Sequence, residues 1–590
     1  MKVSRPGGVW LLAPVIIATG ILLLFAWLAA QAAVETPAEP ALVRVEIRGP
    51  QDLLLFTRLE IPVYDHASEG DGGEYLLTEL DPIQQDDLIA KGLNVRVLDS
   101  PSFGNQYYRI TASKPEALEL ANDVVDVIES RAGASLIQAS PEVAARLVNL
   151  GIELEGLNLH PLVIPQEVSN TESISLTVDT DIAGMIRQVL TSTIYSLTGD
   201  LTGERGTDIS GKPYTITNRY TFYSVPANEV PPIKKAAEYI YQEFDGLALS
   251  PEYHMWESIS YPVITYPSEN YPNVIGTITG TQRPEDIFMI TAHLDDAPLY
   301  EYVEGTSSII DVAPGADDNA SGTVGVLVAA QILSQYEWDC TLRFATFTGE
   351  EQGMLGSSAY AKQAYAQEEN ILAVLNLDMI AYNSKNIPTP DIDLHTHTTQ
   401  DQVIANLFID VISSYGLDLV PEIIQPGTGA SDHAAFWAYG YPAILAIEDR
   451  NDFNPFYHSR NDTLDKLDMD YYTEFVKAAV GTLAHMGCLA GTEGGLAGYA
   501  TDLGSGLPIE GARVSAYNRF GQEWQTFTGP DGSYVLNPTR DFYTVSGEAA
   551  DFVTATITNV QITQGFTTTL NLTLSPMHYL YFPLVPHKTE

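Results

Sequence analysis

Four short, almost uninterrupted apolar segments constrain the fold of this chain more than any other feature. Strands that read this way are buried on both faces, because a strand with one exposed face alternates apolar and polar residues. The segments are residues 286–293, 341–348, 371–378 and 442–449. Stretches with helical periodicity lie before, between and after them, at 230–244, 321–336, 357–367, 401–415 and 472–486. This alternation predicts an α/β domain over about 175–489, with a mostly parallel sheet sandwiched by helices.

An internal repeat precedes this domain. DPIQQDDLIAKGLNVRVL at 81–98 matches SPEVAARLVNLGIELEGL at 140–157, at an offset of 59. Each copy begins with a capping residue followed by proline, and predicts a small strand–helix–strand unit, with a weaker partial copy at 43–65. Residues 35–170 are therefore expected to form an α+β module. It is either a pro-segment that covers an active site or a plain accessory domain.

The C-terminal part of the chain has a different pattern. A linker of small residues at 490–497 leads into short alternating segments and the turn GPDG, which predict a β-sandwich over 498–576. The last residues, 577–590, form an aromatic and apolar tail that is either an edge strand or an export or attachment signal.

Composition excludes some classes of protein. At 590 residues, with 45% hydrophobic and 18% charged residues, the chain is long enough for several globular domains with real cores. The net charge of −47 argues against a nucleic-acid partner, because phosphates require surfaces rich in lysine and arginine. The two cysteines, Cys340 and Cys488, provide no disulfide framework, and we expect two buried free thiols. The sequence predicts no particular oligomeric state.

Residues 1–34 predict export. Lys2 and Arg5 precede an uncharged apolar run that ends at Val34, and Ala30-Gln31-Ala32 fits the small-x-small pattern of a signal-peptidase site. The apolar run exceeds the usual length of a signal core, so an uncleaved membrane anchor is the alternative. We expect a protein that is secreted or displayed at the cell surface.

Acidic and imidazole side chains follow the ends of the predicted strands. In an open parallel sheet, ligand sites form beyond the carboxyl ends of the strands. The motifs found there are TAHLDD, PGADDNASG, FTGEEQG, NLDMIAY and, later, NPFYHSRNDT. They deliver two histidines, a tyrosine and several carboxylates: His293, Asp295, Asp317, Asp318, Glu350, Glu351, Asp378, Tyr457 and His458.

These residues together indicate metal ions. Taken singly, His293 reads as a core histidine, and Glu350 and Glu351 read as solvated loop acids. Gathered at one edge of a sheet, the acids need cations, because buried ionised carboxylates are costly unless they are paired or bound to metal. Few lysines or arginines lie in the motifs. Imidazole with carboxylate favours zinc, the lack of cysteine excludes a sulfur-rich structural site, and histidine disfavours calcium.

The five motifs, in this order, resemble the family of co-catalytic two-zinc aminopeptidases, of the secreted bacterial leucyl-aminopeptidase type. The resemblance covers roughly residues 180–489. It implies an exported metallo-aminopeptidase that hydrolyses N-terminal residues from peptide substrates with two Zn²⁺ ions per chain. The reaction would use a zinc-activated bridging water, since zinc lowers the pKa of bound water to about 7.

The resemblance also implies which residues bind the metals. Asp317 would bridge the two ions, His293 and Asp378 would complete one site, and Glu351 and His458 would complete the other. Gly315 and Gly322 would let the backbone turn tightly around the shared ligand.

Three further residues receive roles from the resemblance. Glu350 would be the general base, Asp295 would orient His293, and Tyr457 would stabilise the oxyanion. Asp318 is expected to cap the following helix.

Alternatives remain for the activity. A carboxypeptidase or a glutaminyl-cyclase-like enzyme of the same fold is one, although cyclase-like relatives keep one zinc. A non-catalytic surface-binding protein is another, although no base or ligand appears lost. The run Ser431-Asp432-His433 invites a serine-hydrolase interpretation, but sequence neighbours seldom form a triad and no GxSxG motif accompanies it. The C-terminal sandwich resembles carboxypeptidase regulatory-like domains, which implies no chemistry.

Overall fold

The computed structural model describes residue 176, then residues 178–577 with gaps, and parts of residues 40–157. The gaps in the longer range are 222–228, 248, 257–258, 262–263, 267, 298–300, 304–305, 309–313 and 386–389. The described N-terminal stretches are 40–49, 61–68, 74–100, 107–112, 125–131, 134–139 and 152–157, with a few single positions between them. The predicted leader or anchor at 1–34 and the tail from 578 lie outside these residues. Within them, none of the helices combines the length and hydropathy that a membrane span requires.

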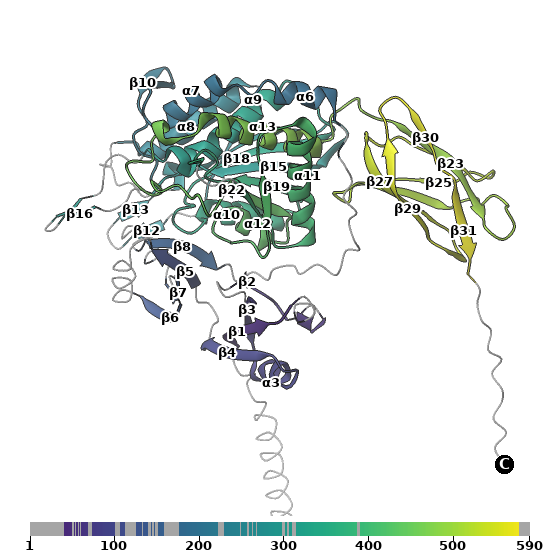
Figure 1. The fold of residues 1–590 in the computed structure, drawn as a ribbon, viewed down its shortest axis with the longest axis horizontal. Helices are drawn as coiled ribbons and strands as arrows, with labels where there is room; N and C mark the ends of the chain where they lie inside the picture. The colour runs from purple at the N-terminus through teal and green to yellow at the C-terminus, as the bar shows by residue number, and fades with distance from the viewer. Residues whose placement is uncertain are drawn as a thin grey trace, which may run out of the picture.

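An eight-stranded sheet forms the centre of the chain (Figure 1). Its strand order is β11-β14-β18-β15-β19-β22-β20-β21. The middle strands pair in parallel and are β18 (Cys340–Phe347), β15 (Arg283–His293), β19 (Asn370–Leu377) and β22 (Ala443–Glu448). They coincide with the four apolar segments, so the predicted α/β fold with a mostly parallel sheet is confirmed.

The edges of the sheet are shorter and partly antiparallel. On one side β14 (Asn273–Ile278) runs antiparallel to β18 and is followed by β11 (Glu252–His254). On the other side β20 (Ile392–His395) runs antiparallel to β22 and parallel to β21 (Pro421–Ile424). The sequence pattern does not predict these edge strands, because segments of three to six residues are too short to show periodicity.

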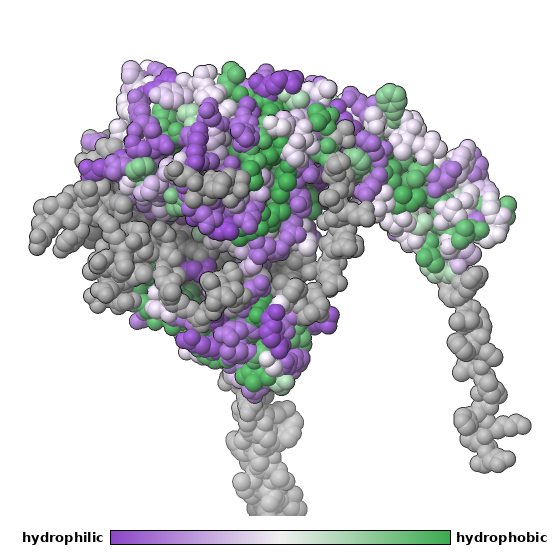
Figure 2. Space-filling view, viewed as in Figure 1, coloured by the Kyte–Doolittle hydropathy of each residue, from purple (hydrophilic) through white to green (hydrophobic). Residues whose placement is uncertain are grey.

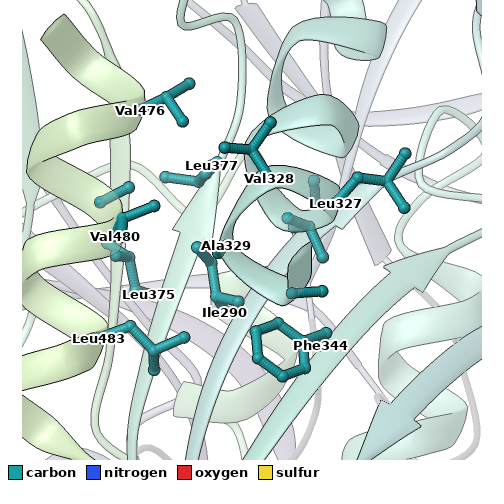
Figure 3. Close-up of a cluster of buried hydrophobic side chains, with 14 of the residues drawn as sticks. Ile290, Leu327, Val328, Ala329, Phe344, Leu375, Leu377, Val476, Val480 and Leu483 are labelled. Carbon is teal, nitrogen blue, oxygen red and sulfur yellow. The ribbon is translucent and has the colours of Figure 1, made fainter. Parts of the chain in front are cut away.

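Helices cover both faces of the sheet (Figure 1). One face packs against α6 (Thr180–Ile186), α7 (Thr191–Leu201), α8 (Pro232–Gly246), α9 (Gly322–Leu333), α11 (Thr399–Tyr415) and α13 (Met469–Met486). The other face packs against α10 (Leu355–Ala366) and α12 (His433–Trp437). Consecutive residues of β15 enter opposite cores: Ile290 packs with α9 and α13 (Figure 3), and Met289 belongs to the other cluster. Burial on both faces explains why these strands are continuously apolar.

The N-terminal module contains two sheets of the same topology. The first has the order β2-β3-β1-β4 and the second the order β6-β7-β5-β8, with antiparallel neighbours throughout. Their strands are β1 (Ala41–Ile47), β2 (Asp65–Ser68), β3 (Glu74–Leu80), β4 (Asn94–Asp99), β5 (Tyr107–Ala112), β6 (Asp126–Arg131), β7 (Ala134–Gln138) and β8 (Ile152–Leu157). The shared order agrees with the internal repeat and extends each copy to a four-stranded antiparallel sheet.

Local sequence explains how one helix of this module begins. The helix α3 (Pro82–Ala90) starts with a capping box between Asp81 and Gln84 and has proline in its first turn, as predicted.

The second copy of the repeat contacts the α/β domain. Tyr108 approaches Gly353, where an added Cβ would lie 3.2 Å from the tyrosine ring. The module therefore contacts the loop that follows β18.

The C-terminal β-sandwich packs against the beginning of β15. It extends from β23 (Gly495–Asp502) to β31 (Leu572–Pro576) and consists of two sheets around one apolar core. Phe520 contacts Phe288 with ring centroids 5.2 Å apart, and Gln522 donates a hydrogen bond of 2.8 Å to Asp286. Seven residues of extended strand, about 23 Å, separate Asp286 from His293 at the other end of β15. The sandwich thus docks at the end of the strand opposite to His293.

Cys340 and Cys488 form a disulfide, so the expectation of two free thiols is wrong. Their Cα atoms lie 5.4 Å apart although 148 residues separate them in sequence. The fold brings them together, because the Asp339 amide bonds to the Cys488 carbonyl at 2.8 Å, where the start of β18 meets the end of α13. Spacing in the sequence carries no sign of this proximity.

Replacing both cysteines by alanine is expected to lower the free energy of unfolding by about 3–5 kcal/mol. The crosslink closes a long loop, and removing it gives the unfolded chain more conformational freedom. Denaturant midpoints of the double variant and of the wild-type protein, followed by tryptophan fluorescence, measure the difference. Equal midpoints would mean that the crosslink does not stabilise the fold.

Candidate metal centre

The side chains that follow the strand ends converge at one edge of the sheet. His293 is the last residue of β15, and Asp378 directly follows β19. Glu351 lies in the loop after β18, and Asp318 lies in the short helical segment η2 (Ala316–Ser321). His458 belongs to the loop after β22 and has a left-handed backbone, with φ of 51°. Parallel strands bring these loops together because their carboxyl ends share one edge.

Asp318 lies between the two imidazoles. Its Oδ1 is 3.2 Å from His293 Nε2, and its Oδ2 is 3.1 Å from His458 Nε2. A second carboxylate faces each imidazole: Asp378 Oδ1 is 3.2 Å from His293 Nε2, and Glu351 Oε2 is 2.9 Å from His458 Nε2. Two groups of one nitrogen and two oxygens result, and Asp318 is common to both.

Asp317 does not occupy the shared position. Its carboxylate accepts hydrogen bonds from the Ala381 amide and from Asn454 Nδ2, both at 2.9 Å. The prediction that Asp317 bridges the two groups is therefore wrong, and so is the prediction that Asp318 caps the helix. Adjacent residues in a turn point in different directions, and spacing does not tell which one faces the site. The backbone of Asp318 (φ −107°, ψ 95°) is not helical.

Two glycines permit this turn, as expected. Gly315 has φ of +47°, and a Cβ there would lie 2.3 Å from the Asp318 carbonyl oxygen. Gly322 has an ordinary helical backbone, but a Cβ there would lie 2.4 Å from the Leu377 carbonyl oxygen. Gly315 supplies the left-handed backbone conformation that the turn requires, and Gly322 allows the backbone to approach β19 closely.

Asp295 connects His293 to Glu350. The Glu350 amide donates to Asp295 Oδ1 at 3.2 Å. His293 Nδ1 lies 3.1 Å from the main-chain oxygen of Asp295 and 3.8 Å from its carboxylate. The backbone carbonyl, rather than the predicted carboxylate, is therefore the nearer partner of the imidazole.

Tyr457 covers His458. The two rings are stacked, with centroids 3.7 Å apart and an angle of 20° between their planes. The structure thus places the predicted tyrosine directly beside one of the two imidazoles.

The electrostatics of this cluster favour positive charge at its centre. Burial opposes protonation of His458, but Glu351 and Asp318 outweigh burial and raise its pKa well above the ordinary value. Burial raises the pKa of Glu350 well above its ordinary value, while the His293 imidazole acts in the opposite direction. Carboxylates buried at this density need a cation among them.

The donor set fits zinc. Among the described residues, His293, Asp318 and Glu351 form the group whose ligand atoms all lie within 4.8 Å of one another. Zinc at 2.0–2.1 Å from tetrahedral nitrogen and oxygen ligands places those atoms about 3.3 Å apart, close to the separations given above. Glu351 Oε1 is buried and has no hydrogen-bond partner, which leaves it available to an ion.

Several supporting residues are not predicted from the sequence. Ser431 donates a 2.7 Å hydrogen bond to Asp378, and the Asp318 amide donates to Asp462 at 3.0 Å. Asp462 belongs to the same motif as His458, which is the only signal that could have found it. His433 Nε2 bonds to the Thr428 carbonyl at 2.8 Å, so Ser431 and His433 are committed to different partners and the serine-hydrolase interpretation fails.

Comparison with known families identifies two domains. Residues 273–483 match peptidase family M28, and residues 495–575 match the carboxypeptidase regulatory-like domain. Both matches confirm the resemblances drawn from the motifs.

Individual relatives are similar over part of their length. A probable aminopeptidase of Saccharomyces cerevisiae is 32% identical over 228 residues, which cover 36% of this chain and 57% of that protein. A probable leucine aminopeptidase of Arthroderma otae is 33% identical over 221 residues, which cover 36% of this chain and 56% of that protein. The chain therefore spans little more than half the length of these relatives. The solved structure of LapB from Legionella pneumophila is 18% identical with a TM-score of 0.46, covering 65% of this chain and 99% of that one.

Proposed function

We propose that this chain, with its peptidase family M28 domain at residues 273–483, is a zinc-dependent aminopeptidase that releases N-terminal residues from peptides. One observation carries the proposal: the two oxygens of Asp318 each face a different imidazole, at 3.2 and 3.1 Å. That arrangement suits two cations that share one carboxylate. His293 and Asp378 would complete one site, and Glu351 and His458 the other.

Charge balance supports two divalent ions. Four carboxylates of the cluster, Asp318, Glu350, Glu351 and Asp378, carry four negative charges when ionised. Two Zn²⁺ ions neutralise them and leave both imidazoles neutral, as metal binding requires. When bound, such ions polarise the scissile carbonyl and make water acidic enough to react at neutral pH.

The protein's own groups supply proton transfer and orientation. Glu350 accepts a proton from the attacking water and delivers it to the leaving amine. The hydrogen bond from the Glu350 amide to Asp295 holds this part of the loop in place. Tyr457, whose ring is stacked on His458, would supply a phenol to stabilise the developing oxyanion.

Substrate class and location follow from the same proposal. We propose cleavage at the amino terminus because the relatives similar to this domain are named as probable aminopeptidases. Export, as a secreted or surface protein, is proposed from the pattern of residues 1–34.

Metal analysis combined with an aminoacyl-anilide panel tests the proposal. We expect about two zinc ions per chain, release of anilide from free aminoacyl substrates, and loss of this activity after treatment with a chelator. Anilides with an acetylated amino group serve as the matched control and should not be cleaved. Equal cleavage of the blocked substrates, or release of C-terminal residues instead, would contradict the aminopeptidase assignment.

A further inference from the structure

A buried segment outside the metal-binding motifs contacts three of the loops around the candidate site. Residues 216–221 have no regular secondary structure, and they precede the matched family segment at 273–483. Asn218, Arg219, Tyr220 and Thr221 are each at most 2% exposed. We call residues 216–221 the strap. Neither the sequence motifs nor the family match assigns it a role.

Arg219 joins the end of β15 to the turn that carries Asp318. Its Nε donates to the Leu294 carbonyl at 2.8 Å, directly after His293. Its two terminal nitrogens donate to the carbonyls of Pro314 and Gly315 at 2.8 and 2.9 Å, and Nη1 also reaches the Leu201 carbonyl at 2.8 Å. One guanidinium thus bonds to the backbone on both sides of the His293–Asp318 contact.

Only an arginine meets this geometry. The guanidinium presents five N–H groups in a rigid plane, and here it reaches four carbonyls in different directions. A lysine has a single nitrogen with three N–H groups and cannot reach all four. Gly315 leaves room for the guanidinium, since a Cβ at that position would lie 2.8 Å from Nη2.

Thr221 joins Asp295 to the loop after β18. Its hydroxyl donates to Asp295 Oδ2 at 3.0 Å and accepts from the Gly349 amide at 3.0 Å. The next amide, of Glu350, donates to the other oxygen of Asp295. The hydroxyl therefore couples the residue that contacts His293 to the loop that carries Glu350 and Glu351.

We infer that Arg219 and Thr221 are positioning residues for the zinc ligands. They hold the loops of His293, Asp318 and Glu351 in a fixed arrangement relative to one another. This inference deepens the proposed function and rests on it for the identity of the metal. Neither residue is one of the candidate ligands, and both bond to the loops that carry them. Hydrogen bonds behind a metal site are worth about 10–100-fold in metal affinity, because they hold the ligands in the binding arrangement before the ion arrives.

The test is the zinc affinity of full-length protein freed of metal, titrated in competition with a chromophoric zinc chelator. Thr221→Val keeps the shape of the side chain and removes the hydroxyl, and we expect it to raise the zinc Kd about 10-fold or more. Thr221→Ser restores the hydroxyl and should bind zinc nearly as the wild-type protein does. Arg219→Lys keeps the positive charge but loses the planar guanidinium with its five N–H groups, and should raise the zinc Kd at least as much.

A matched control separates positioning from stability. Arg343 is a second largely buried arginine, located in β18 and paired with Glu369 at 2.8 Å. Arg343→Lys should lower the Tm of the metal-free protein and leave the zinc Kd unchanged. The inference is overturned if Thr221→Val and Arg219→Lys bind zinc like the wild type, or if Arg343→Lys weakens zinc binding equally. Anilide hydrolysis by the wild-type protein tests the proposed function separately. The zinc Kd of the strap variants can be measured even if the protein has no peptidase activity.

Discussion

Asp318→Asn is expected to abolish peptidase activity and to weaken zinc binding by at least about 100-fold. The substitution removes the one negative charge that faces both imidazoles, and it puts an N–H₂ group where an oxygen must bind a cation. Zinc content after gel filtration and anilide hydrolysis measure the two effects.

Asp317→Asn is the matched control, because it makes the same chemical change one residue earlier. Its carboxylate bonds to the Ala381 amide and to Asn454, away from the imidazoles. We expect this variant to keep its zinc, with a lower Tm because one buried hydrogen bond is lost. The reverse result, in which the variant at 317 loses zinc and the variant at 318 keeps it, would restore the assignment suggested by the motif resemblance.

Glu350→Gln is expected to keep both zinc ions and to lower kcat by about 10²–10⁴-fold, the usual contribution of a general base. Glutamine has nearly the same shape but cannot accept the proton. Its KM should change little, since Glu350 is not among the residues that would bind the ions.

Glu351→Gln gives the comparison for this experiment, because it neutralises the adjacent residue. Glu351 faces His458 at 2.9 Å, so its loss should reduce zinc content as well as turnover. If Glu350→Gln retained wild-type kcat with full zinc occupancy, another group would have to be the base.

The fold could be predicted to the extent that burial leaves a pattern in the sequence. The strands β15, β18, β19 and β22 are buried on both faces, and each appears as an apolar run of the right length. The edge strands leave no such pattern, because they are only three to six residues long. The pairing of Cys340 with Cys488 depends on the meeting of two distant chain segments, which no local pattern records.

The candidate site could be predicted as a set of motifs, but not in its internal arrangement. His293, Glu351, Asp378 and His458 lie where their motifs suggested. The choice between Asp317 and Asp318 depends on the dihedral angles of one turn, and the two residues look alike in the sequence. The strap residues Arg219 and Thr221 bond mainly to the backbone, and a sequence gives no sign of such contacts.

The most direct test of the central claim is anomalous diffraction at the zinc edge, on crystals of the full chain grown with zinc. The account predicts two anomalous peaks, one on each side of the Asp318 carboxylate. One peak should be ligated by His293 and Asp378, and the other by Glu351 and His458. A single peak, or two peaks that share Asp317 or no residue at all, would contradict it.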